Sequence, residues 1–91
     1  MIKYETVVLA KELGYNDAFT LRNLQDWLRE NYDVYIVIEP YKQKGSYKHY
    51  SIQWVDDKFV YIRTVVLEEI NYHILLEQQI QHCLNYLING K

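Results

Sequence analysis

At Val34-Tyr35-Ile36-Val37-Ile38-Glu39 the hydrophobic period of the chain changes from about 3.6 residues to about 2, which indicates a mixed helical and strand fold. The β-branched and aromatic residues of this stretch favour a strand, and Pro40 ends this strand because proline cannot donate to a strand ladder. Residues 49–55 then alternate apolar and polar side chains, which predicts a half-buried second strand. Residues 58–66 predict a third strand, reached through a tight turn at Asp56-Asp57.

Helical patterns lie on both sides of these strands. Apolar residues recur at a spacing of three over residues 4–13, with Gly14 as a stop, and Thr20 is the expected N-cap of a second helix over residues 21–31. The N-cap Asn71 and a wide apolar stripe predict a last helix over residues 71–88.

The pattern as a whole predicts an α+β fold. Two N-terminal helices, a three-stranded antiparallel β-meander and a long C-terminal helix follow in the order α-α-β-β-β-α, with the helices on one face of the sheet. The expected core consists of the apolar residues Leu21, Leu24, Leu28, Ile36, Ile38, Ile52, Leu76, Ile80, Leu84 and Leu87.

Length and composition limit the class of protein. The 91 residues are too few for two independent cores, so residues 1–91 are expected to form a single domain. The 10 tyrosines supply buriable surface, and the net charge of −2 argues against a strongly basic nucleic-acid-binding protein. One cysteine cannot form an intramolecular disulfide, and no apolar run reaches the ~20 residues of a membrane helix. Because no secretory signal is visible either, we expect a cytoplasmic protein without a membrane anchor.

Two segments resemble a known group of sequences. The first is Tyr4-Glu5-Thr6 with Leu9-Ala10-Lys11-Glu12-Leu13-Gly14-Tyr15, followed by Leu24-Gln25-Asp26-Trp27-Leu28-Arg29-Glu30. The second is the last helix, with Tyr72, Leu76-Glu77 and Ile80. These segments resemble short, uncharacterised proteins of gut bacteria and their prophages. The chain departs from that pattern at Leu75 and Gln79, where the group tends to have Ala and Gly. The resemblance implies an α+β fold and a phage or mobile-element origin, and it implies no catalytic residue.

Two residue pairs are candidates for chemistry. His73 and Glu77 have the i, i+4 spacing of two metal ligands on a helix, but no third ligand has a matching spacing, and a surface hydrogen bond is the alternative. His82 and Cys83 are neighbours that a helix turns about 100° apart, so we expect a buried, inert thiol rather than a nucleophile. The interpretation is therefore a non-enzymatic protein with no catalytic residue, no metal and no cofactor.

A basic loop is expected between the first two strands, over residues 41–47. Lys42, Lys44 and Lys48 lie in or beside this loop, with tyrosines interleaved. The pattern suits a phosphate backbone with stacked bases, or else a hairpin tip whose lysines guard a strand edge. From Leu21 onward the order of elements resembles the double-stranded-RNA-binding domain. That family holds phosphates with lysines at the start of its last helix, whereas this chain has no Lys or Arg between Arg63 and Lys91. A nucleic-acid-binding module therefore stays the alternative and is not favoured.

The sheet face that the helices leave open is the expected binding surface, unless the first helix and the loops cover it. Alternation along the first and third strands puts large apolar residues on both faces of the sheet. Such an excess is typical of a surface for a partner or for self-association. We therefore expect a small interaction protein that binds another protein chain, or itself as a homodimer. The expected contact residues are Tyr35, Val37, Tyr61 and Arg63 on the sheet, with Lys42, Lys44 and Lys48 on the loop.

Overall fold

The structure, a computed structural model, describes residues 2–40, 46–68 and 71–90. The element order confirms the predicted α+β fold, α-α-β-β-β-α. The strands form one antiparallel sheet in the order β1-β2-β3. The elements are α1 (Tyr4–Glu12), α2 (Leu21–Tyr32), β1 (Val34–Pro40), β2 (Tyr47–Val55), β3 (Lys58–Glu68) and α3 (Tyr72–Ile88).

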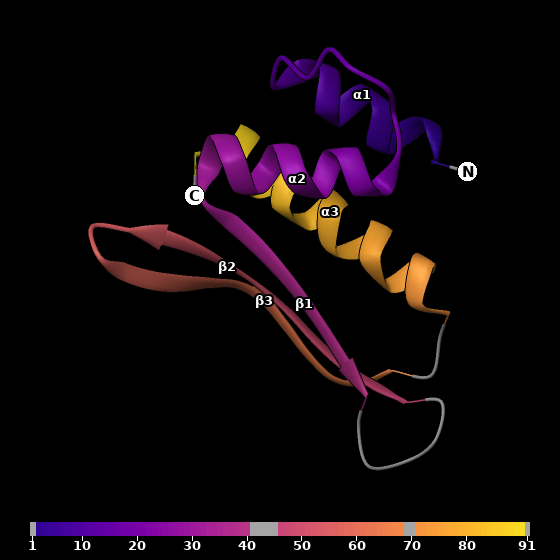
Figure 1. Ribbon diagram of the computed structural model, residues 1–91, viewed down its shortest axis with the longest axis vertical. Coiled ribbons are helices and arrows are strands. Elements are labelled where there is room, and N and C mark those ends of the chain that lie inside the picture. Colours follow the sequence, from indigo (N-terminus) through magenta and orange to yellow (C-terminus); the bar gives the residue numbers. More distant parts are fainter. Residues whose placement is uncertain (1, 41–45, 69–70, 91) are drawn as a thin grey trace.

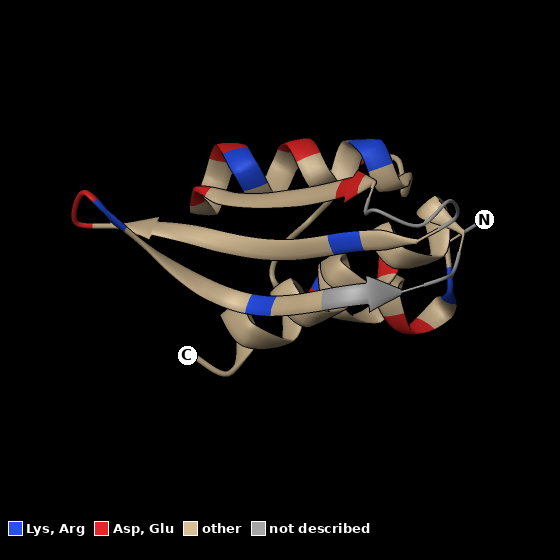
Figure 2. Ribbon diagram, turned by 90° about the horizontal axis from the view of Figure 1, so that it is seen from below, with Lys and Arg blue, Asp and Glu red and all other residues tan. Residues whose placement is uncertain are grey.

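The helices lie on one side of the sheet (Figure 1). Helix α3 packs against all three strands, α2 packs against α3 and β1, and α1 packs on α3 away from the sheet. No described element covers the other face of the sheet, as the view from below shows (Figure 2). The β2–β3 hairpin projects beyond the helices at its turn, so both of its faces are exposed there (Figure 1).

The core lies between the helices and β1. Leu24 and Leu28 of α2 meet Ile80 and Leu84 of α3 in one buried cluster, and Val34 joins it from β1. Helix α2 begins at Leu21, where the Thr20 hydroxyl accepts a hydrogen bond from the backbone N–H of Asn23 as predicted. Nine of the ten expected core residues are buried in the cluster or packed against it, namely Leu21, Leu24, Leu28, Ile36, Ile38, Leu76, Ile80, Leu84 and Leu87.

The tenth expected core residue, Ile52, faces away from the core, so that prediction was wrong. Ser51 is fully buried, and its hydroxyl donates a hydrogen bond to Gln79 of α3. Because adjacent residues of a strand point to opposite faces, Ile52 lies on the open side. The alternation in β2 was recognised, but the polar set, rather than the apolar set, turns towards the helices.

Gly14 ends α1 in a left-handed conformation, with φ of 96°. The backbone N–H of Tyr15 donates to the carbonyl of Ala10 at 3.0 Å, and that of Gly14 donates to the carbonyl of Lys11 at 2.9 Å. This pair of bonds is the Schellman motif, in which a residue without a Cβ avoids a steric penalty. The motif turns the chain so that Tyr15 is buried beside Ala10 in the core.

We expect Gly14→Ala to lower the free energy of unfolding by about 1–2 kcal/mol. The reason is conformational, because a Cβ at this position meets no atom within 4 Å and no clash arises. Urea unfolding followed by circular dichroism measures the change. Gly90 also has positive φ, at 71°, but it lies after the last helix, so Gly90→Ala serves as the matched control with a smaller expected loss. Equal losses in the two variants would contradict the role given to the α1 terminus.

A candidate protein-binding face

The uncovered side of the sheet is built by the register of its strands. In β1, the residues that pack against the core are Val34, Ile36 and Ile38, so the intervening residues point away from the helices. Cross-strand partners share a face, and the pairs Tyr35↔Ile52 and Ile52↔Tyr61 carry this face across the sheet. We call this surface the open face; its residues are Tyr35, Val37, Glu39, Lys48, Tyr50, Ile52, Trp54, Phe59, Tyr61 and Thr64.

Four aromatic rings form a continuous ladder on the open face. The ring centroids of Trp54 and Phe59 are 5.4 Å apart, those of Phe59 and Tyr61 5.6 Å, and those of Tyr61 and Tyr50 5.8 Å. All three contacts are edge-to-face, the geometry that aromatic quadrupoles favour. The exposed fractions are 44% for Trp54, 48% for Phe59 and 57% for Tyr61. The ladder is therefore preorganised by its own contacts and still presents about half of each of these three residues to solvent.

Charge is confined to the ends of the open face. Glu39 and Lys48 are cross-strand partners at one end, which places opposite charges side by side. The turn residues Asp56, Asp57 and Lys58 stand at the other end of the sheet (Figure 2). Asp56 and Asp57 have φ of 51° and 64°, the conformation of the two-residue hairpin turn that the sequence predicts there.

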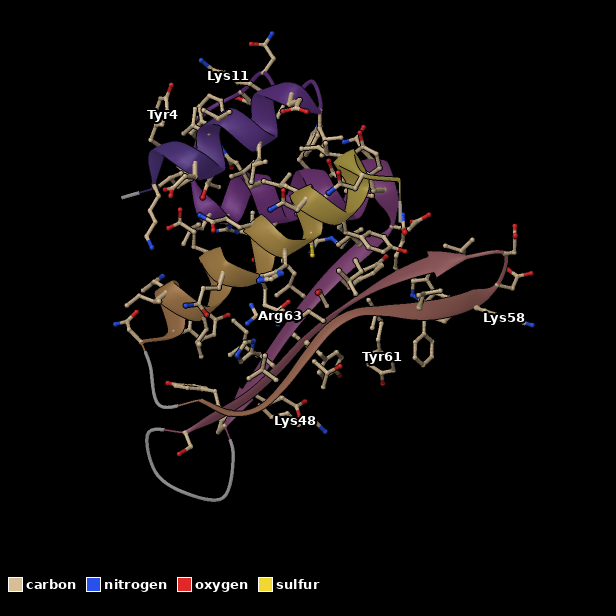
Figure 3. All side chains as sticks on the ribbon, turned by 180° about the vertical axis from the view of Figure 1, so that it is seen from behind. Tyr4, Lys11, Lys48, Lys58, Tyr61 and Arg63 are labelled. Carbon is tan, nitrogen blue, oxygen red and sulfur yellow. The ribbon has the colours of Figure 1, made fainter. Side chains whose placement is uncertain are left out.

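Three of the predicted contact residues lie together, and one does not. Tyr35, Val37 and Tyr61 share the open face. Arg63 was expected beside Tyr61, but it pairs with the buried Ser51 and lies on the covered side, where its Nη1 atom is buried. Figure 3 shows Tyr61 pointing away from the helices and Arg63 towards α3. The physical reason is a β-bulge in β3: Ile52 pairs with Tyr61 and the adjacent Ser51 pairs with Arg63, so Ile62 is an extra residue and strict alternation fails between Tyr61 and Arg63.

The basic loop is described only at its edge. Lys48 lies on β2 at the end of the open face, on the side away from the helices (Figure 3). Lys42 and Lys44 lie outside the described residues. Of the cations expected to bind a partner, the structure therefore places Lys48 alone on the open face, opposite a carboxylate.

The covered side of β2 carries a polar network that sequence reasoning missed. Gln79 of α3 is fully buried; its Oε1 accepts from the Ser51 hydroxyl at 2.8 Å, and its Nε2 lies 2.7 Å from Nδ1 of His49. Because an amide nitrogen can only donate, Nδ1 is the acceptor. The only available signal was the departure at Gln79, where the resembling sequences tend to have Gly.

His73 and Glu77, the candidate pair of metal ligands, lie in different environments, because Glu77 is buried and His73 is exposed. Glu77 is only 8% exposed, and its carboxylate accepts hydrogen bonds from the Lys3 backbone N–H at 2.8 Å and from the Thr6 hydroxyl at 2.6 Å. His73 is exposed at the start of α3. Glu77 therefore connects α1 to α3, and among the described residues no three metal-ligating side chains are grouped together.

Cys83 is buried as predicted. Burial raises the pKa of its thiol to about 11, against a weaker lowering effect of the Ser51 hydroxyl. The thiol is therefore protonated near neutral pH and lacks the thiolate that a nucleophile needs. The neighbouring His82 lies at the surface, where its side chain is partly shielded from water. This desolvation and, to a lesser degree, the Arg63 guanidinium lower the pKa of its imidazole.

The fold and the face together define an α+β domain with helices over one face of an antiparallel sheet and an aromatic ladder on the other. No protein-family model, curated protein sequence or solved structure matches the chain. In the part of the chain that the structure describes, no helix has both the length and the apolar character needed to cross a membrane.

Proposed function

We propose that the chain is a small non-enzymatic binding protein that docks a protein chain on the open face. The observation that supports this most strongly is the ladder of Trp54, Phe59, Tyr61 and Tyr50, with its three outer residues about half exposed. Aromatic side chains supply large contact areas with few rotatable bonds, so they lose little conformational entropy on binding. They are enriched at the centres of protein interfaces, where charged residues are depleted.

The distribution of charge favours a protein partner over nucleic acid. Binding to a phosphate backbone requires cations along the surface, each releasing a condensed counterion. The described part of the open face carries one cation, Lys48, and its cross-strand partner is Glu39. Lys58 stands at the hairpin turn, and Arg63, the other cation described in β3, lies on the covered side. A nucleic-acid surface would have to draw on Lys42 and Lys44, which are outside the described residues.

Site-specific photo-crosslinking tests the proposal. A benzophenone amino acid replaces Tyr61 in the full chain, expressed in the organism that encodes it. The matched control places the same probe at Tyr4, an 80% exposed tyrosine on α1, far from the sheet (Figure 3). We expect protein adducts from position 61 and none from position 4. The cross-linked protein, once purified, should bind the Tyr61→Glu variant at least about tenfold more weakly than it binds the wild-type chain.

Two outcomes would overturn the proposal. Adducts that a nuclease removes would assign the open face to nucleic acid instead. Equal adducts from both positions, or none from position 61, would show that the open face is not a specific docking surface.

A further inference from the structure

The geometry points to a second copy of this chain as the occupant of the open face, with the two sheets packed face to face about a two-fold axis. This inference rests on the proposed function, because it specifies the partner of the same surface. In a two-fold interface each residue near the axis meets its own counterpart, so the patch must be complementary to itself. A charge at the centre would meet an identical charge.

The centre of the open face meets this requirement. The rows Tyr35–Ile52–Tyr61 and Val37–Tyr50–Thr64 cross the middle of the sheet and contain no charged residue. Three of these six residues are tyrosines, whose hydroxyl groups both donate and accept hydrogen bonds. Tyrosine can therefore face tyrosine across a two-fold axis and still satisfy both hydroxyl groups.

The charges at the two ends select one orientation. If the axis is perpendicular to the strands, one copy's Glu39–Lys48 end lies over the other copy's Asp56–Lys58 turn. Each end then places a positive and a negative side chain opposite the other end, so Lys48 can pair with an aspartate in the turn of the partner copy. If the axis instead runs parallel to the strands, Lys48 of the central strand lies near its own counterpart, which is repulsive. The perpendicular axis is therefore the arrangement that the charges favour.

The area of the open face is sufficient for a weak dimer. The nine residues of β2 extend about 30 Å at roughly 3.3 Å per residue, and neighbouring strands lie about 4.8 Å apart. Three strands give about 430 Å² per face, so two such faces bury about 900 Å² in total, the size of a weak, transient interface. We therefore expect a reversible dimer with a dissociation constant on the order of micromolar or weaker. The product is a sandwich of two three-stranded sheets with the helices outside.

Light scattering after size-exclusion chromatography tests the inference on the full chain over a concentration series up to roughly 1 mM. We expect the mass to rise from 11.1 kDa towards twice that value as concentration increases. Tyr61→Glu should weaken dimerisation by at least about tenfold, because it puts two carboxylates near the axis. Val60→Glu is the matched control: it adds the same charge on the adjacent residue, which is 44% exposed and paired with Gln53 outside the open face.

A second measurement needs no variant that could fail to fold. Dilution of the wild-type chain should shift the amide resonances of β1, β2 and β3 and leave those of α1 unchanged. A mass of 11.1 kDa throughout the series would overturn the inference, as would equal weakening by the two variants. If the protein cross-linked at position 61 is a different chain, the inference that a second copy occupies the open face is wrong, while the proposed function stands. If position 61 gives no adduct, both the inference and the proposed function are wrong.

Discussion

Replacing Gln79 by alanine should lower the free energy of unfolding by about 3 kcal/mol or more. The amide is fully buried and joins the Ser51 hydroxyl and Nδ1 of His49, two groups on β2 that are themselves fully buried. The variant removes both hydrogen bonds, leaves polar atoms in the core without the amide, and opens a cavity beneath α3. Urea unfolding followed by the fluorescence of Trp27 and Trp54 measures the loss.

The neighbouring Gln78 provides the control, because it is the same residue on the same helix and is partly exposed. Gln78→Ala should change the free energy of unfolding by less than about 0.5 kcal/mol. The Gln79→Leu and Ser51→Ala variants should also be non-additive when combined, because the double variant removes the donor and the acceptor together. Strict additivity would show that the hydrogen bond between them does not stabilise the fold.

The architecture could be predicted because its signals are local. The β-branched run in β1, the N-caps Thr20 and Asn71, and the turn at Asp56-Asp57 each act within a few residues. Helix α2 shows this best, since Leu24 and Leu28 lie one turn apart on its buried side. Short connections then leave few topologies open to an antiparallel meander.

The face of β2 could not be predicted in the same way. Periodicity shows that His49 and Ser51 point to one face of β2 and that Tyr50 and Ile52 point to the other. It does not show which of the two faces packs against the helices. The choice depends on Gln79, 28 residues further along the chain from Ser51, which supplies hydrogen bonds to the polar set. A buried polar group is tolerated when it is paired, and this pairing leaves the apolar and aromatic residues of β2 on the open face.

Only part of the candidate site could be predicted, because alternation within a strand is visible in the sequence, whereas bulges and the register between strands are not. Tyr35, Val37 and Tyr61 follow plain alternation within their own strands, so their shared face could be read from the sequence. The face of Arg63 was predicted wrongly, because the extra residue of a β-bulge shifts the alternation of β3 and turns Arg63 to the covered side. No local sequence pattern marks this bulge. The ladder adds Trp54 and Phe59, which become neighbours only through the register of the β2–β3 hairpin.

Glu77→Ala should lower the free energy of unfolding by about 2–4 kcal/mol and should weaken α1 more than the rest of the chain. Helix α1 has nine residues and no side-chain cap of its own at Lys3, and helices of this length are marginal by themselves. The Glu77 carboxylate accepts from the Lys3 backbone N–H and from Thr6, and it places a negative charge at the positive end of the α1 dipole. Amide hydrogen exchange should therefore accelerate in α1 before it does in the sheet.

Two comparisons isolate the carboxylate from simple loss of volume. Glu77→Gln keeps the size and one acceptor oxygen, so we expect it to retain roughly half of the stabilisation. Glu12→Ala removes an exposed carboxylate from α1 itself and should change stability by less than about 0.5 kcal/mol. If exchange in α1 stays as slow in Glu77→Ala as in Glu12→Ala, then α1 is held by the packing of Ala10 and Leu9 on the core, and the carboxylate contributes little.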